Sequence, residues 1–109
     1  MLPKVAAHRD GGRHGCHLVV EITRVSDEAG LGRYIEQVGD LVARHGRRYL
    51  ARGPVAAVLE GEHRPLLLGV LEFPNLEAIR ALYDDPEYAP FKALRQESSA
   101  CNFLAVEGL

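Results

Sequence analysis

The sequence predicts a ferredoxin-like α+β fold, in which helices cover one face of a four-stranded antiparallel sheet in the order β-α-β-β-α-β. Three observations support this prediction. An amphipathic helix stops at the segment His45–Gly53, where a strand begins. Residues 66–73 are apolar on both faces, and shorter strand-like runs occupy residues 16–24 and 101–107.

The 109-residue chain divides into residues 1–15 and residues 16–109. The first part contains Gly11, Gly12 and Gly15 among basic residues and shows no periodicity, so we predict a flexible N-terminal arm. The second part has the size of one small domain with a limited core. The histidines of the arm form no metal-ligand pattern, and we expect no metal site.

The composition argues against several classes of partner. The formal net charge of −2 gives no reason to expect nucleic acid or an anionic membrane. No apolar run approaches the roughly 20 residues that span a bilayer, and no charged-then-apolar leader opens the chain. Two cysteines do not make a disulfide scaffold. We therefore expect a cytoplasmic protein with reduced thiols.

The first strand and the first helix have clear sequence signals. Residues 16–24 are rich in β-branched side chains and alternate loosely. Ser26 or Asp27 can cap a helix that runs to His45, and Gly46 suits the left-handed position that closes it. The apolar positions recur at three- and four-residue spacing and are Leu31, Tyr34, Ile35, Val38, Leu41 and Val42.

The second strand is predicted to start at Arg48, to be interrupted at Gly53-Pro54 and to resume over residues 55–61. Because proline lacks an amide hydrogen, this strand should bulge there or lie at a sheet edge. Residues 66–73 predict a strand that is covered on both sides.

The last third of the chain predicts two short helices and a final strand. Asn75 caps a helix over residues 76–83, and residues 85–87 start another that ends near Ser98. Residues 101–107 form the fourth strand.

The apolar third strand implies self-association. With the helices on one face of the sheet, nothing within a single copy covers the other face. A second copy is the economical cover, so we predict a homodimer packed sheet to sheet.

The same topology separates the two cysteines. The first and fourth strands are antiparallel neighbours in this plan, and Cys16 and Cys101 each begin one of them. They should lie about 20 Å apart at opposite ends of the pair, too far for a disulfide.

Four blocks of the sequence, taken together, suggest a family. They are HGRRYLARG, LEGEHRP, VLEFPNLEAIRALYDDPEYAPFKALR and LAVEG. The chain resembles, from about His17 to Gly108, the bacterial domain-of-unknown-function family 1330 of the dimeric α/β-barrel superfamily. The resemblance implies the ferredoxin-like fold and a dimer, without an agreed activity. Related families include cofactor-independent monooxygenases, polyketide cyclases, dehydratases and isomerase-like enzymes.

Three polar residues interrupt strands that should be buried. His17 and Glu21 share one face of the first strand, and Glu72 lies in the third. We expect these two strands to be parallel neighbours, which would bring the three side chains together. A buried carboxylate must be paired, or else its pKa rises and it can act as an acid or a base. We hypothesise that these three residues are catalytic; the alternative places the glutamates at strand ends, in solvent or in ion pairs of the dimer.

Four further residues are candidates for binding the substrate. Arg48 and Arg52 are expected to share one strand face, where they could clamp a carboxylate or an enolate oxygen or pair with nearby acidic groups. Tyr83 or Tyr88, from the second helical region, would complete the pocket. His45 lies in the last turn of the first helix, where its cation favours the helix dipole, so we expect a structural role for it.

Two classes of function fit these features. The first is an enzyme that acts on an apolar or aromatic intermediate by isomerisation, cyclisation, dehydration or oxygenation. No nucleotide, flavin or haem motif is present, so we expect acid–base chemistry by side chains and no cofactor. The second is a non-catalytic ligand-binding or dimerisation module that uses the same cavity.

Overall fold

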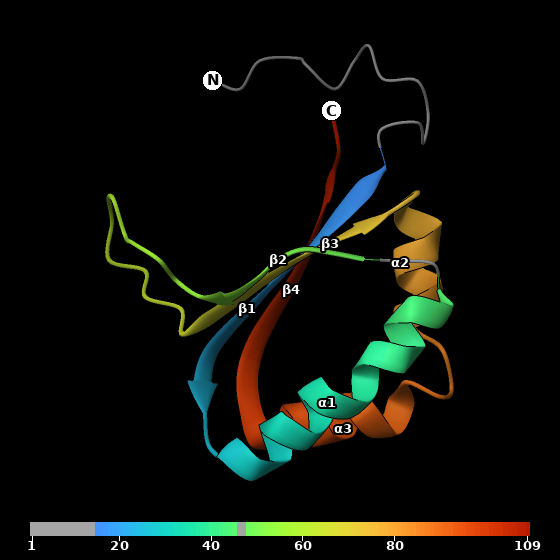
Figure 1. The fold of residues 1–109 in the computed structure, drawn as a ribbon, viewed down its shortest axis with the longest axis horizontal. Coiled ribbons are helices and arrows are strands. Elements are labelled where there is room, and N and C mark those ends of the chain that lie inside the picture. Colours follow the sequence, from blue (N-terminus) through green and yellow to red (C-terminus); the bar gives the residue numbers. More distant parts are fainter. Residues whose placement is uncertain (1–14, 46–47) are drawn as a thin grey trace.

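The computed structural model describes residues 15–45 and 48–109. It contains a four-stranded antiparallel sheet and three helices in the order β-α-β-β-α-α-β (Figure 1), which confirms the predicted fold class. The elements are β1 (Cys16–Val25), α1 (Glu28–Arg44), β2 (Arg48–Pro54), β3 (Leu67–Phe73), α2 (Leu76–Tyr83), α3 (Ala89–Ser98) and β4 (Ser99–Glu107). The predicted arm up to residue 14, and Gly46 as the closing residue of α1, lie outside the described residues.

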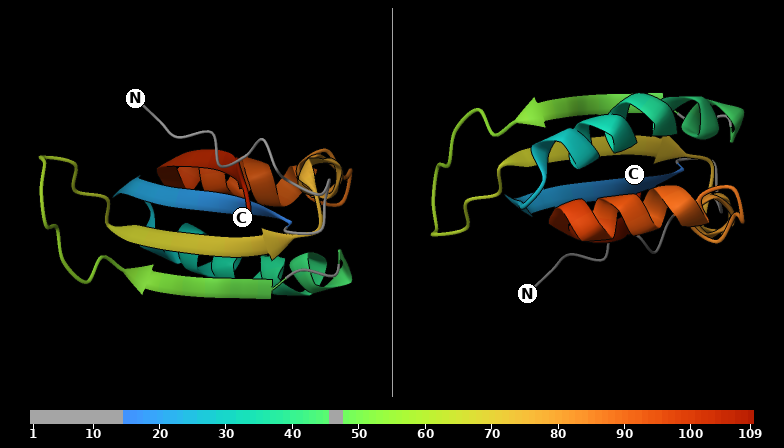
Figure 2. Two further views of the ribbon diagram at one scale, coloured as in Figure 1. Left: turned by 90° about the horizontal axis from the view of Figure 1, so that it is seen from above. Right: turned by 90° about the horizontal axis from the view of Figure 1, so that it is seen from below.

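The helices form one layer and the sheet forms the other. The strands lie in the order β2-β3-β1-β4, and α1 and α3 run side by side across one face of the sheet (Figure 2). The core lies between these two layers because the apolar faces of the helices and of the sheet meet there. Its buried members include Leu18, Val38, Leu41, Leu71, Phe73, Ile79 and Leu82. None of the described helices is long and apolar enough to cross a membrane.

The helix caps follow from local side-chain chemistry. Of the two candidate caps for α1, Asp27 is the one used, and its carboxylate accepts a hydrogen bond from the amide of Gly30 at 3.0 Å. Asn75 caps α2 in the same way, accepting from the amide of Ala78 at 2.9 Å. Each cap satisfies an amide that the first helical turn leaves without a partner.

The structure corrects two element boundaries. Strand β2 ends at Pro54 and does not resume over residues 55–61, which are part of the loop that leads to β3. Pro54 lies in an edge strand, as its missing amide hydrogen requires. Residues 85–87 do not start a helix; residues 86–88 form a turn, and α3 starts at Ala89.

The pairing of β1 with β3 is antiparallel, so the expectation of parallel neighbours is wrong. The hairpin connection reverses β3 relative to β2, while α1 returns the chain so that β2 runs parallel to β1. The register places Glu72 directly opposite His17 and places Leu68 opposite Glu21.

A bulge in β2 decides which way its arginines face. The register moves from Tyr49 opposite Leu71 to Ala51 opposite Val70, so one extra residue is inserted. Arg48 therefore shares a face with Glu72, whereas Arg52 lies opposite Gly69 on the helix-covered face. The prediction that the two arginines share one face is wrong because the insertion changes the alternation of the side chains.

The cysteine prediction is confirmed. Cys16 pairs with Glu107 and Ile22 pairs with Cys101 across β1 and β4, so six residues of strand separate the two thiols. That spacing corresponds to about 20 Å. Both cysteines are free.

The start of α1 is joined to the end of α3 at a crowded contact. The carbonyl of Ser98 accepts hydrogen bonds from the amides of Ser26 and Asp27 at 2.8 and 3.1 Å. A Cβ added at Gly30 would collide with the side chains of Ser98 and Asp27, whereas one added at Gly32 would meet nothing within 4 Å. Glycine is therefore required at the first position but not at the second.

We expect Gly30→Ala to lower the free energy of unfolding by about 1–3 kcal/mol, the usual cost of overpacking. Gly32→Ala is the matched control and should raise it by about 0.5–1 kcal/mol, because alanine is the better helix former. Urea denaturation of both variants and the wild type measures the difference. Equal gains in stability from the two substitutions would contradict the crowding at Gly30.

Candidate functional site

A cavity of about 280 Å³ lies between the helix layer and the sheet. This volume is at the small end of the range of ligand pockets, roughly 300–1,000 Å³. The wall is mainly apolar, and its residues include Leu18, Val20, Ile22, Val38, Val42, Leu71, Ile79, Leu82 and Phe103. The described residues of the wall include no aspartate, glutamate or histidine.

Gly69 leaves the space that the cavity occupies. It faces the helices from β3, opposite Val20 of β1 and Arg52 of β2. A Cβ at this position would make only an ordinary contact, 3.9 Å from the Cβ of Val20. A larger side chain would extend from that point into the cavity. Glycine inside a strand often marks a place where a ligand or another backbone approaches closely.

Two tyrosines of the cavity wall are joined through their hydroxyls. Tyr34 comes from α1 and Tyr88 from the turn before α3, and their hydroxyl oxygens are 2.8 Å apart. Burial raises the pKa of Tyr34 well above its ordinary value, and the neighbouring Tyr88 raises it further. Tyr34 therefore keeps its proton at neutral pH, and its hydroxyl can either donate or accept a hydrogen bond.

A buried arginine lies behind this tyrosine pair. Arg95 of α3 is only 4% exposed, and its guanidinium carbon lies 4.1 Å from the ring centroid of Phe103. Burial lowers the pKa of Arg95, but its interactions with Tyr88 and Tyr34 outweigh burial and raise it above its ordinary value. Its Nε atom is buried and has no hydrogen-bond partner within the described part of the chain.

Three of the predicted substrate-binding residues line the cavity: Arg52, Tyr83 and Tyr88. The guanidinium of Arg52 lies 4.6 Å from the ring centroid of Tyr49, and Arg52 is exposed to solvent. The Lys92 ammonium lies 3.9 Å from the ring centroid of Tyr83. Of these two cations, Arg52 is part of the cavity wall and Lys92 is not.

The fourth predicted residue lies on the opposite face of the sheet, which we call the open face. There Arg48 donates a hydrogen bond from Nε to the carboxylate of Glu72 at 2.9 Å. Both side chains are largely exposed, 72% and 40%. His17 is the register partner of Glu72 on β1. An exposed ion pair of this kind adds little to stability.

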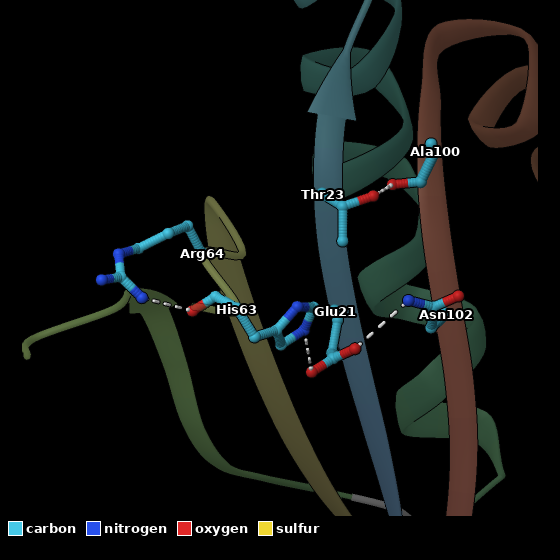
Figure 3. Close-up of polar contacts among 6 residues, drawn as sticks. All are labelled: Glu21, Thr23, His63, Arg64, Ala100 and Asn102. Carbon is cyan, nitrogen blue, oxygen red and sulfur yellow. Dashed lines mark hydrogen bonds and ion pairs between the residues drawn. The ribbon is translucent and has the colours of Figure 1, made fainter. Parts of the chain in front are cut away.

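Glu21 forms a second polar cluster on the open face (Figure 3). One carboxylate oxygen lies 3.0 Å from Nε2 of His63, and the other accepts a hydrogen bond from the Asn102 amide at 3.2 Å. The Glu21 side chain is only 19% exposed. His63 comes from the loop between β2 and β3, and sequence reasoning did not connect it with Glu21.

The structure therefore divides the predicted pocket into three places. His17 and Glu72 lie together, and Glu21 is four residues further along β1, about 13 Å away. Tyr83 and Tyr88 line the cavity on the helix-covered face. A single pocket that contains all of these side chains is wrong for one copy of the chain, because the sheet lies between them.

Sequence reasoning missed two residues of the cavity wall, Gly69 and Tyr34, and also the buried Arg95 behind the tyrosine pair. The glycine inside the apolar run LLLGVLEF was a usable signal. Tyr34 was counted only as one apolar position of the helix. Arg95 was placed on the last helix, but a surface arginine and a buried arginine look the same in a sequence.

His45, at the end of α1, makes a contact of the structural kind that we expected from its position in the sequence. Its Nε2 atom lies 2.9 Å from the carboxylate of Asp85, in the turn before α3, and both side chains are 21% exposed. The other oxygen of Asp85 accepts a hydrogen bond from the amide of Glu87 at 2.8 Å. That amide, followed by the His45 side chain, holds the pKa of Asp85 below its ordinary value.

Comparison with known proteins places the chain in a family and a fold. The sequence profile of a family described as a domain of unknown function, DUF1330, matches residues 16–109. No curated protein sequence matches the chain. A protein of unknown function from Rhodopseudomonas palustris has the same fold, with a TM-score of 0.75 at 17% identity over 89% of this chain and 85% of that one.

Two further solved structures share the fold. A dimeric ferredoxin-like protein of unknown function from Bacteroides fragilis has a TM-score of 0.63 at 14% identity, over 87% of this chain and 97% of that one. SnoaB, a cofactor-independent oxygenase from Streptomyces nogalater, has a TM-score of 0.64 at 11% identity, over 88% of this chain and 94% of that one. At these identities the likeness establishes the fold.

We expect Asp85→Asn to lower stability at neutral pH, because it removes the charge that His45 and the Glu87 amide stabilise. A lowered pKa in the folded state adds stability above the ordinary carboxyl pKa, about 3.9, and this stability is lost as the pH falls through the lowered value. The difference between the variant and the wild type should therefore shrink below pH about 3.9. Thermal unfolding between neutral and strongly acidic pH measures it.

Asp84→Asn is the control for this measurement, since it removes an exposed carboxylate from the neighbouring position. Its effect on stability should be smaller and should vary less with pH. If Asp84→Asn and Asp85→Asn give the same pH profile, the contacts of Asp85 do not stabilise the folded state.

Proposed function

The chain belongs to the DUF1330 family, a domain family of unknown function, and from its geometry we propose that it is a homodimeric protein that binds an apolar or aromatic small molecule. The cavity between helices and sheet is the observation that carries this proposal. Its wall is apolar except for a few polar groups that would orient a ligand, which is the usual character of small-molecule sites. The free thiols of Cys16 and Cys101 are in keeping with the cytoplasmic location that we propose.

The polar groups of the cavity favour ligand binding over proton abstraction. The groups on its wall that hydrogen-bond are tyrosine hydroxyls and the Arg52 guanidinium, while the described wall includes no carboxylate or imidazole to act as a base. Catalysis of the isomerase, cyclase, dehydratase or oxygenase type would therefore rely on stabilising a developing negative charge. SnoaB, which shares the fold, is described as a cofactor-independent oxygenase. The alternative to an enzyme is a non-catalytic binding module. The lack of a carboxylate or imidazole on the described wall favours this alternative.

The catalytic roles of His17, Glu21 and Glu72 stay a prediction. These residues lie on the open face, away from the cavity. Within a sheet-to-sheet dimer they would border the interface. Their ion pairs would then help to set the register between two copies.

We place the dimer interface on the open face because an apolar row crosses all four strands there. The register joins Ala51, Val70, Val19 and Leu104 in this row. The rows on either side contain the polar Arg48–Glu72 and Glu21–Asn102 contacts, together with Val106 in one row and Leu68 in the other. An apolar centre with a polar rim is the usual anatomy of an interface. Proteins with this fold from Bacteroides fragilis and Thermobifida fusca are described as dimeric.

We expect Leu104→Asp to convert the dimer into a monomer, because the substitution buries a charge within the apolar row. The side chain is 57% exposed in the single chain, so the monomer should stay folded. Leu76→Asp is the matched control at the start of α2, where leucine is also exposed and an acidic group favours the helix N-terminus. Analytical ultracentrifugation over a range of protein concentrations measures the molecular mass of each variant in solution. A dimeric Leu104→Asp variant would place the interface elsewhere.

We expect Gly69→Leu to block the cavity, while Gly69→Ala, which makes only an ordinary contact with Val20, leaves it open. Native mass spectrometry of gently purified wild-type protein should show a dimer with an excess mass that disappears on denaturation. The excess should be retained in Gly69→Ala and absent from Gly69→Leu. An excess mass that persists in Gly69→Leu would show that the ligand binds outside the cavity.

A further inference from the structure

We propose that the ligand carries a carbonyl oxygen, and that this oxygen accepts a hydrogen bond from the Tyr34–Tyr88 hydroxyl pair of the cavity wall. This inference rests on the proposed function, and it names the chemical class of the ligand. An apolar or aromatic ketone has the required combination of a rigid apolar body and one strong acceptor.

The hydroxyl pair holds one donor more than its own hydrogen bond uses. The two hydroxyls carry two protons, and the bond between them at 2.8 Å uses one. The guanidinium carbon of Arg95 lies 6.0 Å from the ring centroid of Tyr34, and a guanidinium offers donors only. It therefore cannot accept the second proton. Whichever tyrosine donates within the pair, the hydroxyl of the other tyrosine is left with a proton to donate.

The remaining donor is placed to reach a ligand. Tyr34 and Tyr88 are both among the residues that line the cavity, and on this ground the proposal places the unused proton at its wall. Burial raises the pKa of Tyr34, which keeps the hydroxyl protonated. A buried donor without an acceptor is costly, because it loses its hydrogen bond to water. A ligand acceptor removes that cost.

The positive charge of Arg95, behind the Tyr34–Tyr88 pair, favours a ligand oxygen that carries partial negative charge. Arg95 is buried at 4% exposure, and among the described ion pairs none joins it to a carboxylate. Its positive charge polarises the hydroxyls in a low-dielectric setting and makes the last of them a stronger donor. Such a chain of donors, fixed in place before the ligand arrives, favours the partial negative charge of a carbonyl oxygen.

The rest of the wall limits the remainder of the ligand. Phe103, Leu71 and Val20 make most of the sheet side apolar, and the hydrogen-bonding groups on that side are those of Tyr49 and Arg52 from β2. The volume of about 280 Å³ suits a small ring system. Indane and 1-indanone are therefore suitable probes, since they share a fused two-ring body and differ by one carbonyl group.

The experiment compares the dissociation constants of 1-indanone and indane by calorimetry in the wild type and in Tyr34→Phe/Tyr88→Phe. Both tyrosines are replaced because either hydroxyl can remain as a donor when the other is lost. In the double variant the ratio of the two constants, ketone over hydrocarbon, should rise about tenfold, the effect of losing one buried hydrogen bond. Indane binding reports whether the cavity of the variant is intact.

Two further measurements make the assignment specific. Tyr49→Phe removes another hydroxyl from the cavity wall, outside the Tyr34–Tyr88 pair, and should keep the wild-type ratio within about twofold. The infrared carbonyl band of bound 1-indanone should lie at lower frequency in the wild type than in the double variant, because a hydrogen bond weakens the C=O bond.

The outcomes separate this inference from the proposed function. If indane binds the wild type but the ratio is unchanged in Tyr34→Phe/Tyr88→Phe, the carbonyl inference fails and the ligand-binding function stands. If the ratio rises in Tyr49→Phe instead, the donor is misassigned and the inference also fails. If neither probe binds the wild type, the proposed function fails, and the inference fails with it.

Discussion

The pairing of β1 with both β3 and β4 is the constraint on which the arrangement depends. Hydrogen bonds to two neighbours set the direction of every side chain on β1, and each register partner faces the same way. Leu18 and Val20 face the helices, while His17, Val19 and Glu21 face the opposite side. Because the sheet is one layer of backbone, a residue can take part in the chemistry of only one side.

The two sides have different chemistry as a result. The helix-covered side holds an apolar cavity whose polar groups are hydroxyls backed by a buried cation. The open side holds an apolar row between ion pairs and hydrogen bonds at the surface. The first arrangement is suited to holding one small molecule, and the second is suited to meeting another protein surface.

The helix layer keeps the cavity open because α1 and α3 support each other at one end. Ser98 at the end of α3 binds the amides of Ser26 and Asp27 at the start of α1. At the other end of α1, His45 binds Asp85 in the turn before α3. Held at both ends, α1 spans the sheet above Gly69, and Tyr34 meets Tyr88 across the gap between the helices.

The sequence by itself determined the order of elements and the cap of α2, because these follow from local periodicity and side-chain capping. It narrowed the cap of α1 to Ser26 or Asp27, and the missing amide hydrogen of Pro54 narrowed β2 to a bulge or a sheet edge. It also brought out His17, Glu21 and Glu72 as polar residues within strands. Only the tertiary structure decided which residues meet. The bulge in β2 separates Arg48 from Arg52 through one inserted residue, and the burial of Arg95 depends on rings from three different segments. Register and burial arise from contacts between segments far apart in the chain, so no local pattern encodes them.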